Sequence, residues 1–234
     1  MLSAIAIVPS APVLVPELAG AAAAEVAELS AAVLATAALL PSRWVVVGTG
    51  RSDDVLGPNG PNSMGTFAGF GADVRVRLSP QADDRDELPV EFPVCALLAA
   101  WVRGQARPEA SAQVRVYRGD HDAGTALAHG RRLRAEIDRA PDAIGVLVVA
   151  DGANTLTPSA PGGYDPGNAG AQLALDDALA NGDTDALTRL PQQILGRVAF
   201  QVLAGLTEPG PRSAKEFYRG APYGVGYFVG AWQP

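Results

Sequence analysis

The chain has 234 residues, of which 48% are hydrophobic and 18% are charged, so it can bury a sizeable core as an ordered globular protein. Its formal net charge is −7 and its only short basic run is Arg131, Arg132 and Arg134, which argues against a nucleic-acid partner. Cys95 is the single cysteine, which excludes an intrachain disulfide and a cysteine-based zinc site.

The amino-terminal residues predict a cytoplasmic protein that has no membrane partner. Residues 1–8 contain no basic stretch ahead of their apolar run, which argues against a signal peptide. The alanine-rich segment 18–40 is interrupted by Glu25 and Glu28, and alanine anchors weakly in a bilayer. A core helix is therefore predicted in this segment. The composition leaves a homo-oligomer open.

Short apolar runs alternate with helical patterns along the chain. Strands are predicted at 5–8, 44–48, 74–78, 114–117, 144–150 and 223–232. Helices are predicted at 16–40, 95–102, 127–137, 173–179 and 194–206. Near-continuous apolar strands suit a sheet that is buried on both faces. We therefore expect a three-layer α/β/α sandwich with a mixed, mainly parallel sheet, forming a single domain over residues 1–234.

Two loops mark where a site is expected. Residues 57–63 and 157–170 are rich in proline, glycine and asparagine, and both follow predicted strands. Ligands of open α/β sheets bind beyond the carboxyl ends of the strands. Gly48-Thr-Gly50 is not a dinucleotide motif, because the position that needs a third glycine is Asp53. A tight turn after the strand is predicted there instead.

Five blocks of sequence carry a resemblance to a known family. They are Ile7-Val-Pro-Ser-Ala-Pro-Val-Leu-Val-Pro-Glu-Leu18, Phe67-Ala-Gly-Phe-Gly-Ala72, Asp120-His-Asp122, Ala150-Asp-Gly-Ala-Asn-Thr-Leu-Thr-Pro-Ser-Ala-Pro-Gly-Gly-Tyr-Asp-Pro166 and Ala221-Pro-Tyr-Gly-Val-Gly-Tyr227. These blocks resemble segments of the catalytic subunits of class III extradiol ring-opening dioxygenases, the LigB type, and they occur in the same order as in that family. The resemblance covers almost the whole chain and implies a LigB-like α/β domain.

The residues at the family's catalytic positions have changed. The family is expected to hold Fe(II) with two histidines and one carboxylate, which leaves positions open for catechol and oxygen. The resemblance puts Ser10 and Arg51 at the histidine positions and Thr155 at that of an acid/base histidine. The carboxylate is expected within 191–207, which contains no Asp or Glu. The leading prediction is a pseudoenzyme without a metal cofactor that binds a small anion in the former active-site cleft.

Residues that follow different strands are expected to meet in this cleft. Arg51 would supply the positive charge for a carboxylate or phosphate, unless it pairs with Asp151. Ser10, Arg51, His121 and Asp151 are expected to converge there, and the tyrosines 164 and 227 to line it. The predicted site residues are Ser10, Arg51, His121, Asp151, Thr155, Tyr164 and Tyr227.

Two alternative functions stay open. A dioxygenase with relocated Fe(II) ligands would need both histidines, His121 and His129. If both lie on or beside one helix, the rise of about 1.5 Å per residue separates them by roughly 12 Å, too far for one transition metal, and His129 is expected to face solvent. A metal-free acid/base enzyme would instead use His121 and Asp151 as its catalytic residues. A hard cation such as Mg²⁺ on Asp151 also stays open.

Overall fold

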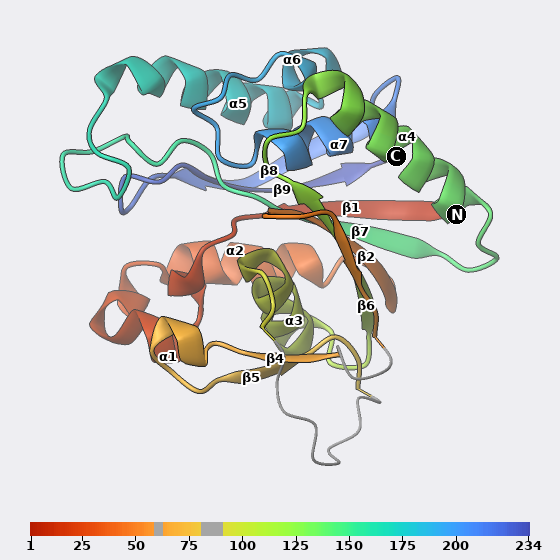
Figure 1. Cartoon of the computed structure of the whole chain (residues 1–234), viewed down its shortest axis with the longest axis horizontal. Helices are drawn as coiled ribbons and strands as arrows, with labels where there is room; N and C mark the ends of the chain where they lie inside the picture. Colours follow the sequence, from red (N-terminus) through yellow and green to blue (C-terminus); the bar gives the residue numbers. More distant parts are fainter. Residues whose placement is uncertain (59–62, 81–90) are drawn as a thin grey trace.

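A seven-stranded sheet forms the centre of the computed structural model, which describes residues 1–58, 63–80 and 91–234 (Figure 1). Its strand order is β3-β6-β2-β7-β1-β9-β8. The strands are β1 (Leu2–Val8), β2 (Arg43–Gly50), β3 (Asp54–Leu56), β6 (Ser111–Arg118), β7 (Ile144–Val149), β8 (Ser213–Gly220) and β9 (Tyr227–Gln233). The four central strands β6, β2, β7 and β1 are parallel, and β3, β9 and β8 each pair antiparallel with their neighbours.

Helices cover both faces of this sheet, which confirms the predicted three-layer α/β/α fold (Figure 1). One face carries α4 (Ala123–Asp138), α5 (Ala169–Asn181), α6 (Thr184–Thr188) and α7 (Arg197–Thr207). The other face carries α1 (Pro16–Ala19), α2 (Ala27–Ala37) and α3 (Val94–Ala106), together with a small sheet of β4 (Met64–Thr66) and β5 (Arg75–Arg77). None of the helices in the described residues is long and apolar enough to span a membrane.

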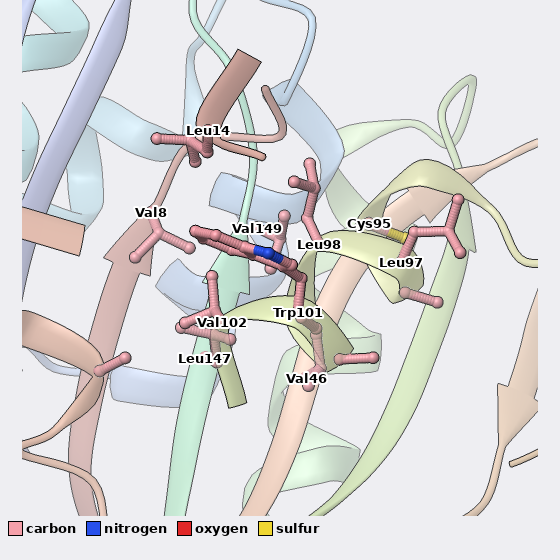
Figure 2. Packing of buried hydrophobic residues seen from close by; sticks show 14 of the residues in the cluster. Val8, Leu14, Val46, Cys95, Leu97, Leu98, Trp101, Val102, Leu147 and Val149 are labelled. Atoms are coloured by element: carbon pink, nitrogen blue, oxygen red, sulfur yellow. The ribbon is translucent and has the colours of Figure 1, made fainter. Parts of the chain in front are cut away.

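The central strands send alternate side chains into two hydrophobic clusters, because successive residues of a strand point to opposite faces. In β1, Ile5 and Ile7 belong to the cluster under α4 and α7, whereas Ala6 and Val8 belong to the cluster over α2 and α3. Figure 2 shows the second cluster, in which side chains of α3 face the strands. The residues labelled there are Val8, Leu14, Val46, Cys95, Leu97, Leu98, Trp101, Val102, Leu147 and Val149.

Two glycines let α4 and α7 touch backbone to backbone. A Cβ atom on Gly130 would overlap the carbonyl oxygen of Val202, and a Cβ atom on Gly205 would overlap that of Leu127. A larger residue at either position would push the helices apart. This contact therefore fixes how far α4 lies from α7.

The structure differs from the sequence-based expectation at three places. The helix predicted at 16–40 is divided into α1, a 3₁₀ segment and α2, because Gly20 ends α1 with a φ of 54°, in a region that favours glycine. The strand predicted at 74–78 lies in the small sheet. The tight turn predicted at 48–50 is wrong, since β2 continues to Gly50 and Gly48 packs against Cys95. Of the predicted loop 57–63, residues 59–62 lie outside the described part of the chain.

Candidate functional site

Asp53, His121 and His129 meet beyond the carboxyl ends of β2 and β6, and we call them the His–Asp cluster. The two strands are parallel neighbours with Gly50 opposite Arg118, so the segments that follow them emerge side by side. His121 Nε2 lies 2.8 Å and 3.0 Å from the two carboxylate oxygens of Asp53. The ring centroids of His121 and His129 are 5.1 Å apart. One ligand atom from each of the three residues lies within 4.8 Å of the others.

The backbone around the cluster is held by hydrogen bonds from three directions. The amide of Arg118 donates to Asp53 Oδ1 at 2.7 Å. Asp122 caps α4, since its Oδ1 accepts a hydrogen bond from the Thr125 amide at 2.9 Å, so the helix begins directly after His121. Arg197 of α7 donates to the carbonyl oxygen of His121 at 3.0 Å. These hydrogen bonds position the Asp53 carboxylate, the backbone of His121 and the start of the helix that carries His129.

The expectation that the two histidines lie too far apart for one metal is wrong. His121 precedes α4 and is not on it, so the helical rise does not separate the two residues. Side chains of a helix also tilt toward its amino terminus, which leans His129 back toward His121. His129 is half-buried against Tyr117, with 4.9 Å between the ring centroids, and does not simply face solvent.

The electrostatics of the cluster suit metal binding. Partial burial raises the pKa of Asp53, but the hydrogen bond from the Arg118 amide and the contact with His121 outweigh it, so the pKa lies below its usual value. Burial, and then the neighbouring His121, lower the pKa of His129. Asp53 is thus ionised and His129 neutral near pH 7, which are the forms that bind metals.

A cavity of about 520 Å³ opens beside the cluster, between β3, β6 and α4, and we call it the β6 cavity. Asp53 and His129 lie in its wall. Its charged lining also includes Arg115, which pairs with Glu136 at 2.7 Å, and Arg132. This volume is in the range of small-molecule sites.

A second cavity of about 770 Å³ lies on the other side of Asp54 and Val116, which line both hollows, and we call it the Arg51 cavity. Arg51 lines it together with Phe70 and Phe92. In the described part of the chain, no hydrogen bond or ion pair engages the Arg51 side chain, and the proposed pair with Asp151 is not formed.

Ser10 and Asp151 meet at the carboxyl ends of β1 and β7. The Ser10 amide donates to Asp151 Oδ1 at 2.7 Å. Burial raises the pKa of Asp151 to about 7, and the hydrogen bond from Ser10 opposes that rise. Tyr227 is buried nearby, and its pKa is raised by burial and then by Asp151. These three of the predicted site residues are brought together.

Gln172 of α5 holds the segment that follows Asp151 in place. Gln172 Oε1 accepts a hydrogen bond from the Ala153 amide at 2.8 Å, and its Nε2 donates to Asp176 at 2.8 Å. A Cβ atom on Gly152 or Gly226 would overlap the Gln172 side chain. The side-chain amide of Gln172 thus packs between the two segments that contain Gly152 and Gly226.

The other predicted residues separate from this pair. Thr155 Oγ1 accepts a hydrogen bond from Asn168 at 2.9 Å, and Tyr164 is 54% exposed. Among the described residues, no hydrogen bond or ion pair joins Ser10 and Asp151 to Arg51 or His121. The expectation that Ser10, Arg51, His121 and Asp151 meet in one cleft is therefore wrong: Ser10 contacts Asp151, His121 lies in the His–Asp cluster, and Arg51 lines its own cavity. Nothing in this geometry makes His121 and Asp151 one acid/base pair.

Comparison with known proteins supports the fold. No family model matches the chain, and no curated protein matches it by sequence. Among solved structures, it is similar to the crystal structure of uncharacterized protein JW3007 from Escherichia coli K12, with a TM-score of 0.58 over 98% of this chain and 99% of that one. The two sequences are 10% identical, so the likeness shows the fold alone.

Proposed function

We propose that this chain is a metal-dependent enzyme that acts on a small molecule and holds one divalent transition-metal ion in the His–Asp cluster. The observation that carries the proposal is that ligand atoms of Asp53, His121 and His129 lie within 4.8 Å of one another. Two atoms that are each about 2.0–2.2 Å from one ion are at most about 4.4 Å apart, so a small side-chain adjustment would complete the site.

The donor set indicates which ion and which chemistry to test first. Two imidazoles and one carboxylate suit Fe(II), and three protein ligands leave coordination positions open for a substrate and oxygen. This is the form that a dioxygenase with relocated ligands would take. Ring opening of a small aromatic compound by oxygen is the reaction that the family resemblance implies. Asp53 and the two histidines would hold the ion, and the β6 cavity would admit the substrate.

Metal content tests the site directly. Purified protein loaded without oxygen with Fe(II), Co(II) or Zn(II) and then desalted should retain about one ion per chain. Asp53→Asn and His129→Ala should each lose it. Asp54→Asn is the matched control, because Asp54 is the adjacent carboxylate and lies outside the cluster. The proposal fails if wild type retains no ion, or if Asp53→Asn retains as much as Asp54→Asn.

Oxygen uptake tests the reaction. The Fe(II)-loaded protein should consume oxygen in the presence of a catechol, and His129→Ala should not. If the protein binds the ion but consumes no oxygen, the proposed metal site stands and the proposed ring-opening reaction is refuted.

A second candidate is metal-free binding of a small anion in the Arg51 cavity. It is favoured by the Arg51 guanidinium, which lines a cavity of about 770 Å³ and has no ion-pair partner among the described residues. A charge-assisted contact contributes roughly 1.5–3 kcal/mol, so Arg51→Gln should weaken such binding about tenfold to a hundredfold. Calorimetry with chelator-treated protein and an anion panel tests this. Equal affinity of wild type and Arg51→Gln would refute it.

A further inference from the structure

We infer that the β6 cavity binds the anionic group of a small carboxylate or phosphonate between Arg132 and the metal ion, and that the bound metal strengthens this binding at least tenfold. This inference rests on the proposed metal site. It adds a substrate class, a residue that recognises it and a dependence of anion binding on the metal.

Arg132 stands where it can hold such a group. His129 and Arg132 are three residues apart on α4, so they share one face of the helix, and both line the β6 cavity. A guanidinium binds planar, bidentate acceptors such as carboxylates well.

The Arg132 side chain is also free to bind a ligand. Within the described ranges it forms no ion pair or side-chain hydrogen bond, whereas its neighbour Arg131 makes two hydrogen bonds to Glu208, at 2.8 Å and 2.7 Å. The other arginine of the cavity, Arg115, is paired with Glu136. An anionic ligand can therefore bind Arg132 without breaking an ion pair within the protein, whereas it would have to compete with Glu136 for Arg115.

The charges of the lining make anion binding depend on the metal. The cavity is lined by three carboxylates, Asp53, Asp54 and Glu136, and by two guanidinium groups, Arg115 and Arg132, so the charges of these five groups sum to −1. A divalent ion in the cluster changes this to +1. Since metal and anion would stabilise each other's binding, the coupling is reciprocal.

The test uses isothermal titration calorimetry on chelator-treated and Co(II)-loaded protein, after metal binding has been measured separately. The probes are succinate and methylphosphonate, with succinamide as the neutral control. We expect the Co(II)-loaded protein to bind at least one of the two anions and not succinamide, and the metal-free protein to bind at least tenfold more weakly. Arg132→Gln should weaken binding about tenfold or more and retain Co(II). Arg131→Gln should match wild type.

Each other outcome overturns the inference in a recognisable way. If Co(II) binds and neither anion does, or if Arg132→Gln binds as tightly as wild type, the metal site stands and the substrate class is refuted. If Arg51→Gln loses the anion while Arg132→Gln keeps it, the anion belongs to the Arg51 cavity. If metal-free protein binds equally well, the dependence on metal is refuted. If Co(II) does not bind at all, the proposed function itself fails.

Discussion

The imidazole rings of His121 and His129 lie 5.1 Å apart between centroids, although one residue precedes α4 and the other lies within it. This proximity depends on where the helix starts and on where it packs. The Asp122 cap starts α4 directly after His121, and the Gly130 contact with α7 fixes the helix next to His129. The geometry of the candidate site thus depends on contacts well outside its ligands.

Metal binding should stabilise the folded protein. An ion that binds only the folded state adds about 2.7 kcal/mol at a free concentration one hundred times its Kd. Differential scanning calorimetry with Zn(II) should therefore show a higher Tm that EDTA reverses. Asp53→Asn should abolish the shift and Asp54→Asn should keep it. A shift of equal size in both variants would point to nonspecific binding.

Gly130→Ala should be strongly destabilising, by roughly 2–4 kcal/mol, because the new methyl group would overlap the α7 backbone. Gly104→Ala in α3 is the matched control, since a Cβ atom there has no described neighbour within 4 Å outside its own helix. That change should be neutral or stabilise by up to about 1 kcal/mol. Urea unfolding of both variants checks this. A similar free-energy change in both would contradict the close packing of α4 on α7.

Asp151 should make the stability depend on pH. Its folded-state pKa of about 7 lies above the unfolded value, so the protonated group contributes stability that is fully present below about pH 4 and is lost as pH rises through 7. Asp151→Asn keeps the acceptor for the Ser10 amide and carries no charge. It should therefore match wild type near pH 4 and exceed it by roughly 1–3 kcal/mol at pH 8. Denaturant titrations at the two pH values measure this, and an equal difference at both would refute it.

Cys95 should be chemically inert in the folded protein. Its side chain is buried against Gly48, and burial raises the pKa of the thiol to about 12. Because the thiolate is the reactive form, a thiol reagent at pH 8 should label the native protein very slowly and the urea-unfolded protein fully. Rapid labelling of native protein would show that α3 opens away from β2.

The central strands could be predicted from the sequence, whereas the edge of the sheet could not. β1, β2 and β7 are largely buried on both faces and therefore read as continuous apolar runs, whereas β6 alternates half-buried and buried residues from Ser111 to Val116. β8 is half-exposed and contains Lys215, Glu216 and Arg219, so it resembles a loop in sequence. Its strand form comes from pairing with β9, which no local pattern shows.

The His–Asp cluster was missed for a similar reason. Asp53 and His121 are 68 residues apart in sequence, and only the parallel pairing of β2 with β6 brings their segments together. One signal was available, since Asp53 and His121 each closely follow a predicted strand end. The sequence gives no strand order, however, so it could not show that these two ends are neighbours.

The packing of Gln172 between Gly152 and Gly226 has a consequence for local unfolding of the protein. The amides of Gly152, Ala153 and Gly226 lie outside the strands, yet they donate to Gly226, Gln172 and Ala153 respectively. Their hydrogen exchange should be slow, and it should become fast only when α5 detaches and carries Gln172 away. The segment that bears Asp151 and the helix that covers it therefore form one cooperative unit of unfolding.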